Sequence, residues 1–375
     1  MSDLLGLSIG TTNLVAACPG RQPVTRRSVL TLWDNRPPEV GVPSQNPELT
    51  SPNLTQGSLV LRGFVERVGD PVPLVAADGS THRGEALVVM ALTALARAVD
   101  DGIPPTTVVV TAPAHWGPAA IGSLRGALRE SPLLSPGGLP PTIVSDATAA
   151  LAALQADPGL PGSGVVALCD FGAGGTSITL ADAGANLAPI GETVRFGDFS
   201  GDQIDRALLD HVLAGIRAAG GEDTAGTAAF GALTRLREEC RLAKERLSFE
   251  TTTALAADLP GFRSDIMVTR AELNAVIADP LTGFLDALGD ALERNRIPAT
   301  SLTAIGVVGG GSVIPAVSQR LSDSLQVPVI ASPGPTAAAA VGAVMLAARG
   351  TTYQDAGAAP TGLSTTPADA PTGLA

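Results

Sequence analysis

The chain has 375 residues and a formal net charge of −12, with 24 Lys and Arg residues against 36 Asp and Glu residues. This acidic balance argues against a general nucleic-acid-binding protein, because Lys and Arg supply the affinity for phosphate backbones. The length favours two or more domains or lobes. Cys18, Cys169 and Cys240 lack metal or redox spacing and are expected to be reduced core thiols.

The N-terminus has no basic segment ahead of an apolar run, so we expect no signal peptide. No charge-free apolar run reaches the length of a membrane-spanning helix; the run 336–348 is too short and is expected to be a buried helix. The sequence therefore predicts a soluble, cytoplasmic protein that binds neither membranes nor nucleic acid.

Apolar runs of strand and helix type alternate in the first half of the chain. The expected elements are strands at 4–9 and 14–18, a weak strand at 58–61, a helix at 86–99, a strand at 106–111, a helix at 118–128, a strand at 142–144 and a helix at 147–155. The stretch 37–78 is rich in Pro, Gly and Asn. The Gly-Ser-Gly segment at 162–164 is expected to be a hinge between two halves.

A similar order then repeats. The expected elements are strands at 165–170 and 178–181, helices at 204–218 and 230–247, a strand at 266–269, helices at 270–277 and 281–295, a strand at 304–308, a helix at 314–325, a strand at 327–330 and a helix at 336–348. The repetition indicates a duplicated α/β architecture. Residues 351–375 are mostly Thr, Ala, Pro and Gly, with Ala-Pro-Thr-Gly-Leu twice, and are expected to be a disordered tail.

Two glycine-rich turns, at 6–13 and 170–177, each follow one strand and lead directly into another. A turn of this kind points consecutive backbone amides into one concavity, which suits a phosphate. A third glycine run, at 307–311, also follows a strand. Two such hairpins facing each other would hold a polyphosphate from both sides.

These segments together resemble the nucleotide-binding domain of the Hsp70/DnaK chaperones, within the actin-like ATPase superfamily. The resemblance runs in order over residues 4–348. It rests on the segments 6–13, 108–116, 145–150, 170–176, 201–205, 240–248, 309–315 and 335–342. It implies a two-lobed fold of mixed sheets flanked by helices, with ATP or ADP and Mg²⁺ in the cleft between the lobes.

The resemblance also implies a division of the chain. Residues 1–162 are expected to form lobe I, to which 333–350 return, with a small subdomain at about 37–103. Residues 163–332 are expected to form lobe II, with a small subdomain at about 203–300. The family's β-rich peptide-binding domain is not expected in residues 351–375, so direct chaperoning of substrate proteins is not predicted.

The resemblance implies roles for individual residues. Asp170 is expected to hold Mg²⁺ through water or to orient the attacking water, and Asp146 to reach the water shell of the metal. From the sequence alone, Asp170 could instead start a turn, Asp146 could be a helix N-cap, and Lys244, the only lysine, could be a solvated helix residue. The implied nucleotide-binding residues are Gly10, Thr11, Thr12, Asn13, Gly172, Gly174, Gly175, Thr176, Gly201, Asp202, Lys244, Gly309, Gly310 and Gly311.

Several positions depart from the family pattern. Ser8 and Ser177 stand where the family has acidic residues, and Val313 stands where it has an Arg that stacks on adenine. The first lobe has no lysine to serve as the family's catalytic lysine, and Arg62 is only a distant substitute. Each loss of a positioned acid or base costs about 10²–10⁴-fold in rate, so we expect hydrolysis to be weak or absent.

The sequence thus predicts an Hsp70-like ATP/ADP-binding protein, either a weak Mg²⁺-dependent ATPase that works as a conformational switch or an inactive nucleotide-binding interaction module with an unknown protein partner. An actin-like or sugar-kinase-like protein is a third alternative. A hydrolase nucleophile elbow at 6–10 is rejected because a strand, not a helix, follows Ser8. His82, His115 and His211 show no ligand spacing and are expected to be structural or surface residues.

Overall fold

The computed structural model describes residues 4–42, 58–99, 105–218 and 227–349; the predicted tail at 351–375 lies outside them. The first half contains the following strands and helices in chain order: β1 (Leu4–Ile9), β2 (Asn13–Ala17), β3 (Val24–Arg27), β4 (Leu30–Trp33), β5 (Glu39–Val40), β6 (Ser58–Leu61), η2 (Val65–Arg67), β7 (Leu74–Val75), β8 (Thr81–His82), α1 (Gly84–Val99), β9 (Thr107–Ala112), α2 (Pro118–Arg129), β10 (Thr142–Ser145) and α3 (Asp146–Ala156).

The second half follows with β11 (Val165–Phe171), β12 (Thr176–Asp182), β13 (Ala188–Phe196), α4 (Gly201–Ala218), α5 (Thr227–Leu247), β14 (Thr252–Leu259), β15 (Phe262–Thr269), α6 (Arg270–Arg294), β16 (Leu302–Val308), η6 (Gly310–Val313), α7 (Pro315–Leu325), β17 (Val329–Ala331) and α8 (Ala338–Ala348).

Two five-stranded sheets with the same topology organise the described chain. The first sheet has the order β3-β2-β1-β9-β10, and the second has the order β13-β12-β11-β16-β17. In each sheet the first three strands in chain order pair antiparallel. A fourth strand pairs parallel with the first, and the fifth pairs parallel with the fourth. The fold is therefore the expected two-lobed, actin/Hsp70-like architecture, and each lobe is named here after its sheet.

Other elements pack on both faces of each sheet, so the central strands consist of nearly continuous runs of apolar residues. In β11, Val165, Ala167 and Cys169 belong to the large core of the second lobe, whereas Val166 and Leu168 face α3. Helices α1 and α2 cover one face of the first sheet, and α8 together with α3 covers the other. The alternation of side chains along each strand explains why one strand contributes to two cores.

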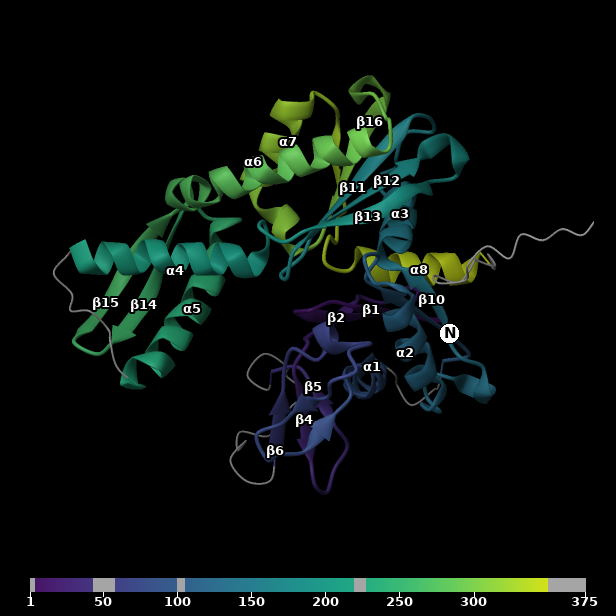
Figure 1. Cartoon of the computed structure of the whole chain (residues 1–375), viewed down its shortest axis with the longest axis horizontal. Helices are drawn as coiled ribbons and strands as arrows, with labels where there is room; N and C mark the ends of the chain where they lie inside the picture. Colours follow the sequence, from purple (N-terminus) through teal and green to yellow (C-terminus); the bar gives the residue numbers. More distant parts are fainter. Residues whose placement is uncertain (1–3, 43–57, 100–104, 219–226, 350–375) are drawn as a thin grey trace, which may run out of the picture.

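Helices α3 and α8 lie between the two sheets (Figure 1). They approach so closely that a Cβ on Gly342 of α8 would lie 1.8 Å from the carbonyl oxygen of Ala149 in α3. A Cβ on Gly6 of β1 would similarly lie 2.3 Å from the carbonyl oxygen of Ala340. These close contacts require glycine at positions 342 and 6.

The structure differs from the predicted elements in specific places. The strands that were not expected are β3, β4, β5, β7, β8, β13 and β14. The two helices predicted at 270–277 and 281–295 form the single helix α6, which continues through Pro280. The smaller sheet β5-β4-β6 lies in the first lobe. In the second lobe, the β14–β15 hairpin packs on α5. The boundaries predicted for the lobes and their small subdomains stay a prediction.

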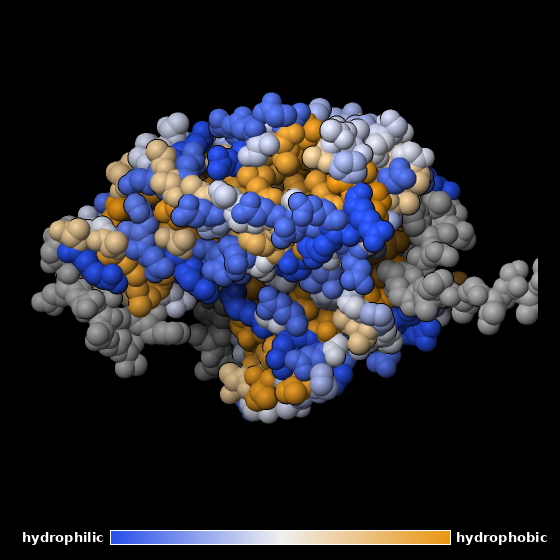
Figure 2. Space-filling model, turned by 45° about the horizontal axis from the view of Figure 1, so that its top comes forward, coloured by the Kyte–Doolittle hydropathy of each residue, from blue (hydrophilic) through white to orange (hydrophobic). Residues whose placement is uncertain are grey.

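Exposed large hydrophobic side chains are scattered over separate elements. They include Val72, Leu139, Phe249 and Met267. On the face shown in Figure 2, hydrophilic and hydrophobic residues are interspersed. No helix within the described residues combines the length and the apolar character needed to cross a membrane.

Candidate functional site

The first glycine turn joins β1 to β2. Its conformation requires Gly10, because a Cβ there would lie 2.6 Å from the carbonyl oxygen of Asn13. Ser28 anchors the turn with two hydrogen bonds. Its hydroxyl donates to the Gly10 carbonyl at 2.7 Å, and its amide donates to the Thr12 carbonyl at 2.8 Å. The turn is thus anchored through two of its carbonyl groups, while Thr11 and Thr12 line the central cavity.

The second glycine turn joins β11 to β12 and is held by the start of α4. The amide of Gly201 donates to the Gly172 carbonyl at 3.1 Å, and the amide of Asp202 donates to the Ala173 carbonyl at 2.9 Å. A Cβ on Gly201 would lie 3.1 Å from the Cα of Ala173, so a larger residue here would press on the second turn. These two amides therefore position the second turn.

The third glycine run follows β16 and packs on the end of β11. Gly309 has a φ of 83°, and a Cβ there would lie 2.3 Å from Oδ1 of Asp170. A Cβ on Gly311 would lie 2.9 Å from Cβ of Phe171. Because β11 and β16 are parallel neighbours, the second turn and this run meet at the same edge of the sheet.

The three glycine segments surround a cavity of about 430 Å³, within the usual range for small-molecule sites. The predicted site residues that line it are Gly10, Thr11, Thr12, Asn13, Asp146, Asp170, Gly172, Gly201, Asp202, Lys244, Gly309, Gly310 and Gly311. Gly174, Gly175 and Thr176 are not among its lining residues. The Thr176 hydroxyl instead donates to the Phe199 carbonyl at 2.7 Å, in the interior of the second lobe.

Asp146 and Asp170 bring two carboxylates to the cavity from different lobes. Ser145, not Asp146, caps α3, because its hydroxyl accepts from the Thr148 amide at 3.0 Å. Asp146 instead accepts a hydrogen bond from the Ala114 amide at 2.9 Å. Burial, and then the neighbouring Asp170, raise the pKa of Asp146 to about 7, and burial raises the pKa of Asp170.

Arg195 on β13 is a charged residue of the site that the sequence did not reveal. Its Nη1 donates to the hydroxyl of Ser177, the residue opposite it on β12, at 3.1 Å. Its guanidinium also packs against the second glycine turn, since a Cβ on Gly175 would lie 2.6–2.9 Å from three guanidinium atoms. The signal was missed because the strand that carries Arg195 was not predicted.

His115 was expected to be a structural or surface residue, yet it lines the same cavity, in the turn after β9. Burial, and then the positive charge of Arg195, lower the pKa of His115 to about 4. The imidazole is therefore neutral at neutral pH. Arg62, in contrast, is not among the lining residues. Its positive charge is one of the smaller contributions that lower the pKa of Glu238 in α5.

Lys244 is tied into the second lobe. Its Nζ lies 2.7 Å from Oδ1 of Asp205 and donates to the Gly201 carbonyl at 3.1 Å. Both side chains are largely buried, at 13% and 5% exposed. Lys244 is therefore not a solvated helix residue; it links α5 to the start of α4 at the wall of the cavity.

Asp146 and Asp170 are carboxylates of the cavity wall that would accept hydrogen bonds from the water shell of Mg²⁺. This cation prefers charged oxygen ligands and retains several waters. Ser8 and Ser177 also line the cavity, but their hydroxyls are neutral, and Arg195 adds a positive charge beside Ser177. Among the described residues, no group of three or more His, Cys, Asp or Glu could hold a metal. The expected water-mediated metal at Asp170 stays a prediction.

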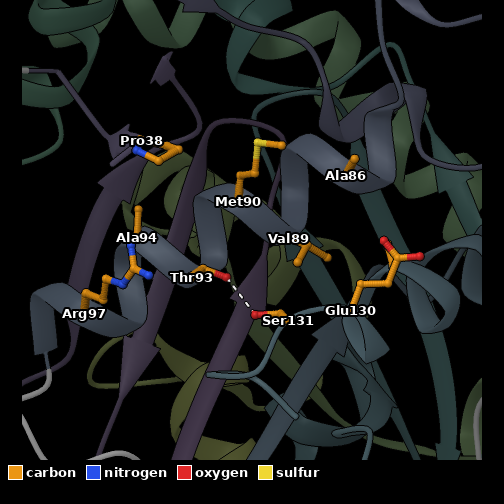
Figure 3. Close-up of a pocket in the computed structure, with 10 residues that line it drawn as sticks. Pro38, Ala86, Val89, Met90, Thr93, Ala94, Arg97, Glu130 and Ser131 are labelled. Atoms are coloured by element: carbon orange, nitrogen blue, oxygen red, sulfur yellow. Dashed lines mark hydrogen bonds between the residues drawn. The ribbon is translucent and has the colours of Figure 1, made fainter. Parts of the chain in front are cut away.

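A second hollow, of about 280 Å³, lies between α1 and α2 (Figure 3). Ala86, Val89 and Met90 of α1 give it a mostly apolar wall, and the hydroxyls of Thr93 and Ser131 satisfy each other at 3.1 Å. It lacks the converging glycine turns of the larger cavity. We assign no ligand to it.

Comparisons with known proteins agree with this architecture. The family model described as "Hsp70 protein" matches residues 64–354. A curated relative, the "Heat shock 70 kDa protein" of Emericella nidulans, is 26% identical over 291 residues, which are 76% of this chain and 44% of the relative. The chain thus spans less than half the length of this relative.

Proposed function

Because the chain belongs to the Hsp70 family, we propose that it binds ATP or ADP in the cavity between its lobes and changes conformation with the nucleotide. The observation that carries this proposal is the convergence of three glycine segments, from both sheets, on one cavity. Backbone amides in such turns provide a site for phosphate. A ligand that contacts both lobes favours their closed arrangement, which is how binding would act as a switch.

Slow hydrolysis is part of the proposal. Asp170 lies at the end of β11 beside the second turn and would orient a water toward the terminal phosphate, with Thr11 and Thr12 binding that phosphate. Mg²⁺, when bound to a nucleotide, neutralises phosphate charge. The neutral Ser8 and the lack of a lysine in the first lobe favour a low rate.

Calorimetry with ATP and ADP tests binding. We expect a single site per chain, and absence of binding at millimolar nucleotide would overturn the proposal. Adenosine alone should bind more weakly than either nucleotide, because the two glycine turns would contact only the phosphates.

Steady-state hydrolysis by the wild type and by Asp170→Asn separates a slow ATPase from a module that only binds. Asp286→Asn, on an exposed face of α6, is the matched control. A slow ATPase loses about 10²–10⁴-fold in rate in Asp170→Asn and nothing in the control. Equal measurable rates in all three proteins would exclude the assigned role of Asp170, and no rate above background in the wild type would leave the inactive binding module.

A further inference from the structure

Glu66 brings a carboxylate of the first lobe to the second glycine turn. A Cβ on Gly174 would lie 3.4 Å from Oε1 of Glu66 and 3.2 Å from Oγ1 of Thr11, so the two oxygens are no more than 6.6 Å apart. Thr11 lines the cavity and is one of the residues proposed to bind the terminal phosphate. A phosphate held by the Thr11 hydroxyl would therefore have the Glu66 carboxylate as a neighbour.

The backbone that carries Glu66 is held in place by packing. Glu66 lies in η2, and the two residues before it, Phe64 and Val65, are buried in the core of the first lobe. Gly84 of α1 lies against the same short helix, since a Cβ there would lie 2.5 Å from the carbonyl oxygen of Arg67. The Glu66 side chain is exposed, but its backbone is fixed beside the second turn.

The Glu66 carboxylate also lies near Arg195, which lines the cavity from the second lobe. Nη2 of Arg195 lies 3.6 Å from the same Cβ position on Gly174, so it is no more than 7.0 Å from Oε1 of Glu66. Within the described parts of the chain, Glu66 forms no ion pair within 4.0 Å. Burial lowers the pKa of Arg195, and the charges of Asp170, Asp146 and Glu66 oppose this change. The guanidinium is thus already attracted to carboxylates before any phosphate binds.

A carboxylate fixed at this point acts differently on nucleotides of different length. The terminal phosphate of a triphosphate would reach the Thr11 hydroxyl, where Glu66 would repel it and compete with it for Arg195. A diphosphate has one phosphate fewer and does not need to enter this space. One unit charge at about 6 Å changes an affinity by about 10-fold in a medium between protein and water.

We propose that Glu66 makes the cavity selective for a nucleoside diphosphate over the corresponding triphosphate. This inference rests on the proposed nucleotide site and adds to it the class of ligand that the site favours. The selectivity comes from the charge of the carboxylate and not from its size.

The test compares the affinities for ADP and for a non-hydrolysable analogue of ATP, measured by calorimetry on the whole chain in the same excess of Mg²⁺. The wild type should bind ADP about 10-fold more tightly than the triphosphate. Glu66→Gln keeps the size of the side chain and removes its charge. It should therefore raise the affinity for the triphosphate by about 10-fold and change the affinity for ADP little.

Two further variants separate the local charge from other effects. Glu66→Lys reverses the charge, so it should favour the triphosphate more strongly than Glu66→Gln does. Glu293→Gln removes an exposed carboxylate near the end of α6 that does not line the cavity, and it should bind both nucleotides like the wild type.

The outcomes separate this inference from the proposed function. Absence of binding of either nucleotide by the wild type overturns both. Triphosphate binding by the wild type that is as tight as ADP binding, or a preference for ADP that is unchanged in Glu66→Gln, overturns the inference while the nucleotide site stands. A preference for ADP that falls in Glu66→Gln and falls further in Glu66→Lys supports the inference.

Discussion

Replacing Asp146 with Asn tests whether the folded protein disfavours the ionised form of Asp146, which lies buried near Asp170. Burial and the neighbouring Asp170 raise the pKa of Asp146 from 3.8 to about 7, whereas Arg195 and the amides of Ala114 and Ala147 favour its charged form less strongly. The oxygen of Asn can still accept the hydrogen bond from the Ala114 amide. The substitution therefore removes mainly the charge.

The sign and size of the effect follow from proton linkage. The unfolded chain loses the Asp146 proton near its ordinary pKa, about 4, whereas the folded protein keeps it up to about pH 7. Between these pH values the folded state binds the extra proton, so the free energy of unfolding falls as the pH rises. About three pKa units correspond to at most about 4 kcal/mol. For a chain of this length that is about 5 °C in Tm.

The assay is thermal unfolding of the nucleotide-free protein, followed by calorimetry at about pH 5 and about pH 8. Asp146→Asn should melt several degrees above the wild type at the higher pH, with a much smaller gain at the lower one. Asp286→Asn should follow the wild type at both. If Asp146→Asn melts below the wild type at pH 8, the folded protein stabilises the ionised carboxylate and the reasoning fails.

Three other substitutions have defined outcomes. Gly309→Ala should lower Tm and abolish nucleotide binding, because the new Cβ meets a carboxylate oxygen at 2.3 Å and the φ of 83° is strained for alanine; calorimetry and ATP titration measure both. Lys244→Met should cost about 3–5 kcal/mol in chemical denaturation by leaving Asp205 buried without its partner, and adding Asp205→Asn should recover most of the loss. Gly342→Ala should lower Tm more than Gly289→Ala, whose added Cβ meets nothing within 4 Å.

The sequence predicted the parts of the fold that have strong local signals. Both glycine turns join the hairpin strands they were expected to join, and the third glycine run follows its strand. The helix predicted at 147–155 is α3, and the strand predicted at 58–61 is β6. Glycine-rich turns and continuous apolar runs are informative because each pattern is typical of only a few kinds of local structure.

The elements that the sequence did not predict differ little in hydrophobicity between their two faces. Strand β14 alternates exposed and buried residues, but alanine and threonine occupy many of its positions, so the period of two is hard to see. Pro280 suggested a break between two helices, yet the helix continues around it, with Leu281 and Phe284 buried in the core. Tertiary packing overrode the local signal there.

Arg195 was missed for a different reason. A single arginine on an exposed strand is ordinary, and its importance comes from the second glycine turn, which lies about twenty residues earlier in the chain. Ser177 gave an indirect signal: a position that is acidic in the family is neutral here and faces Arg195 across the β12–β13 pair. Cross-strand partners become visible only when the register is known.

The crossing of α3 and α8 has a consequence for biosynthesis. β1 is the first described element to leave the ribosome, yet α8, the last, covers one of its faces, with Gly6 against Ala340. The apolar surface around Val15 is therefore covered only after α8 has been made, whereas Val109 can pack on α3 earlier. During synthesis this surface is open to solvent and to other nascent chains.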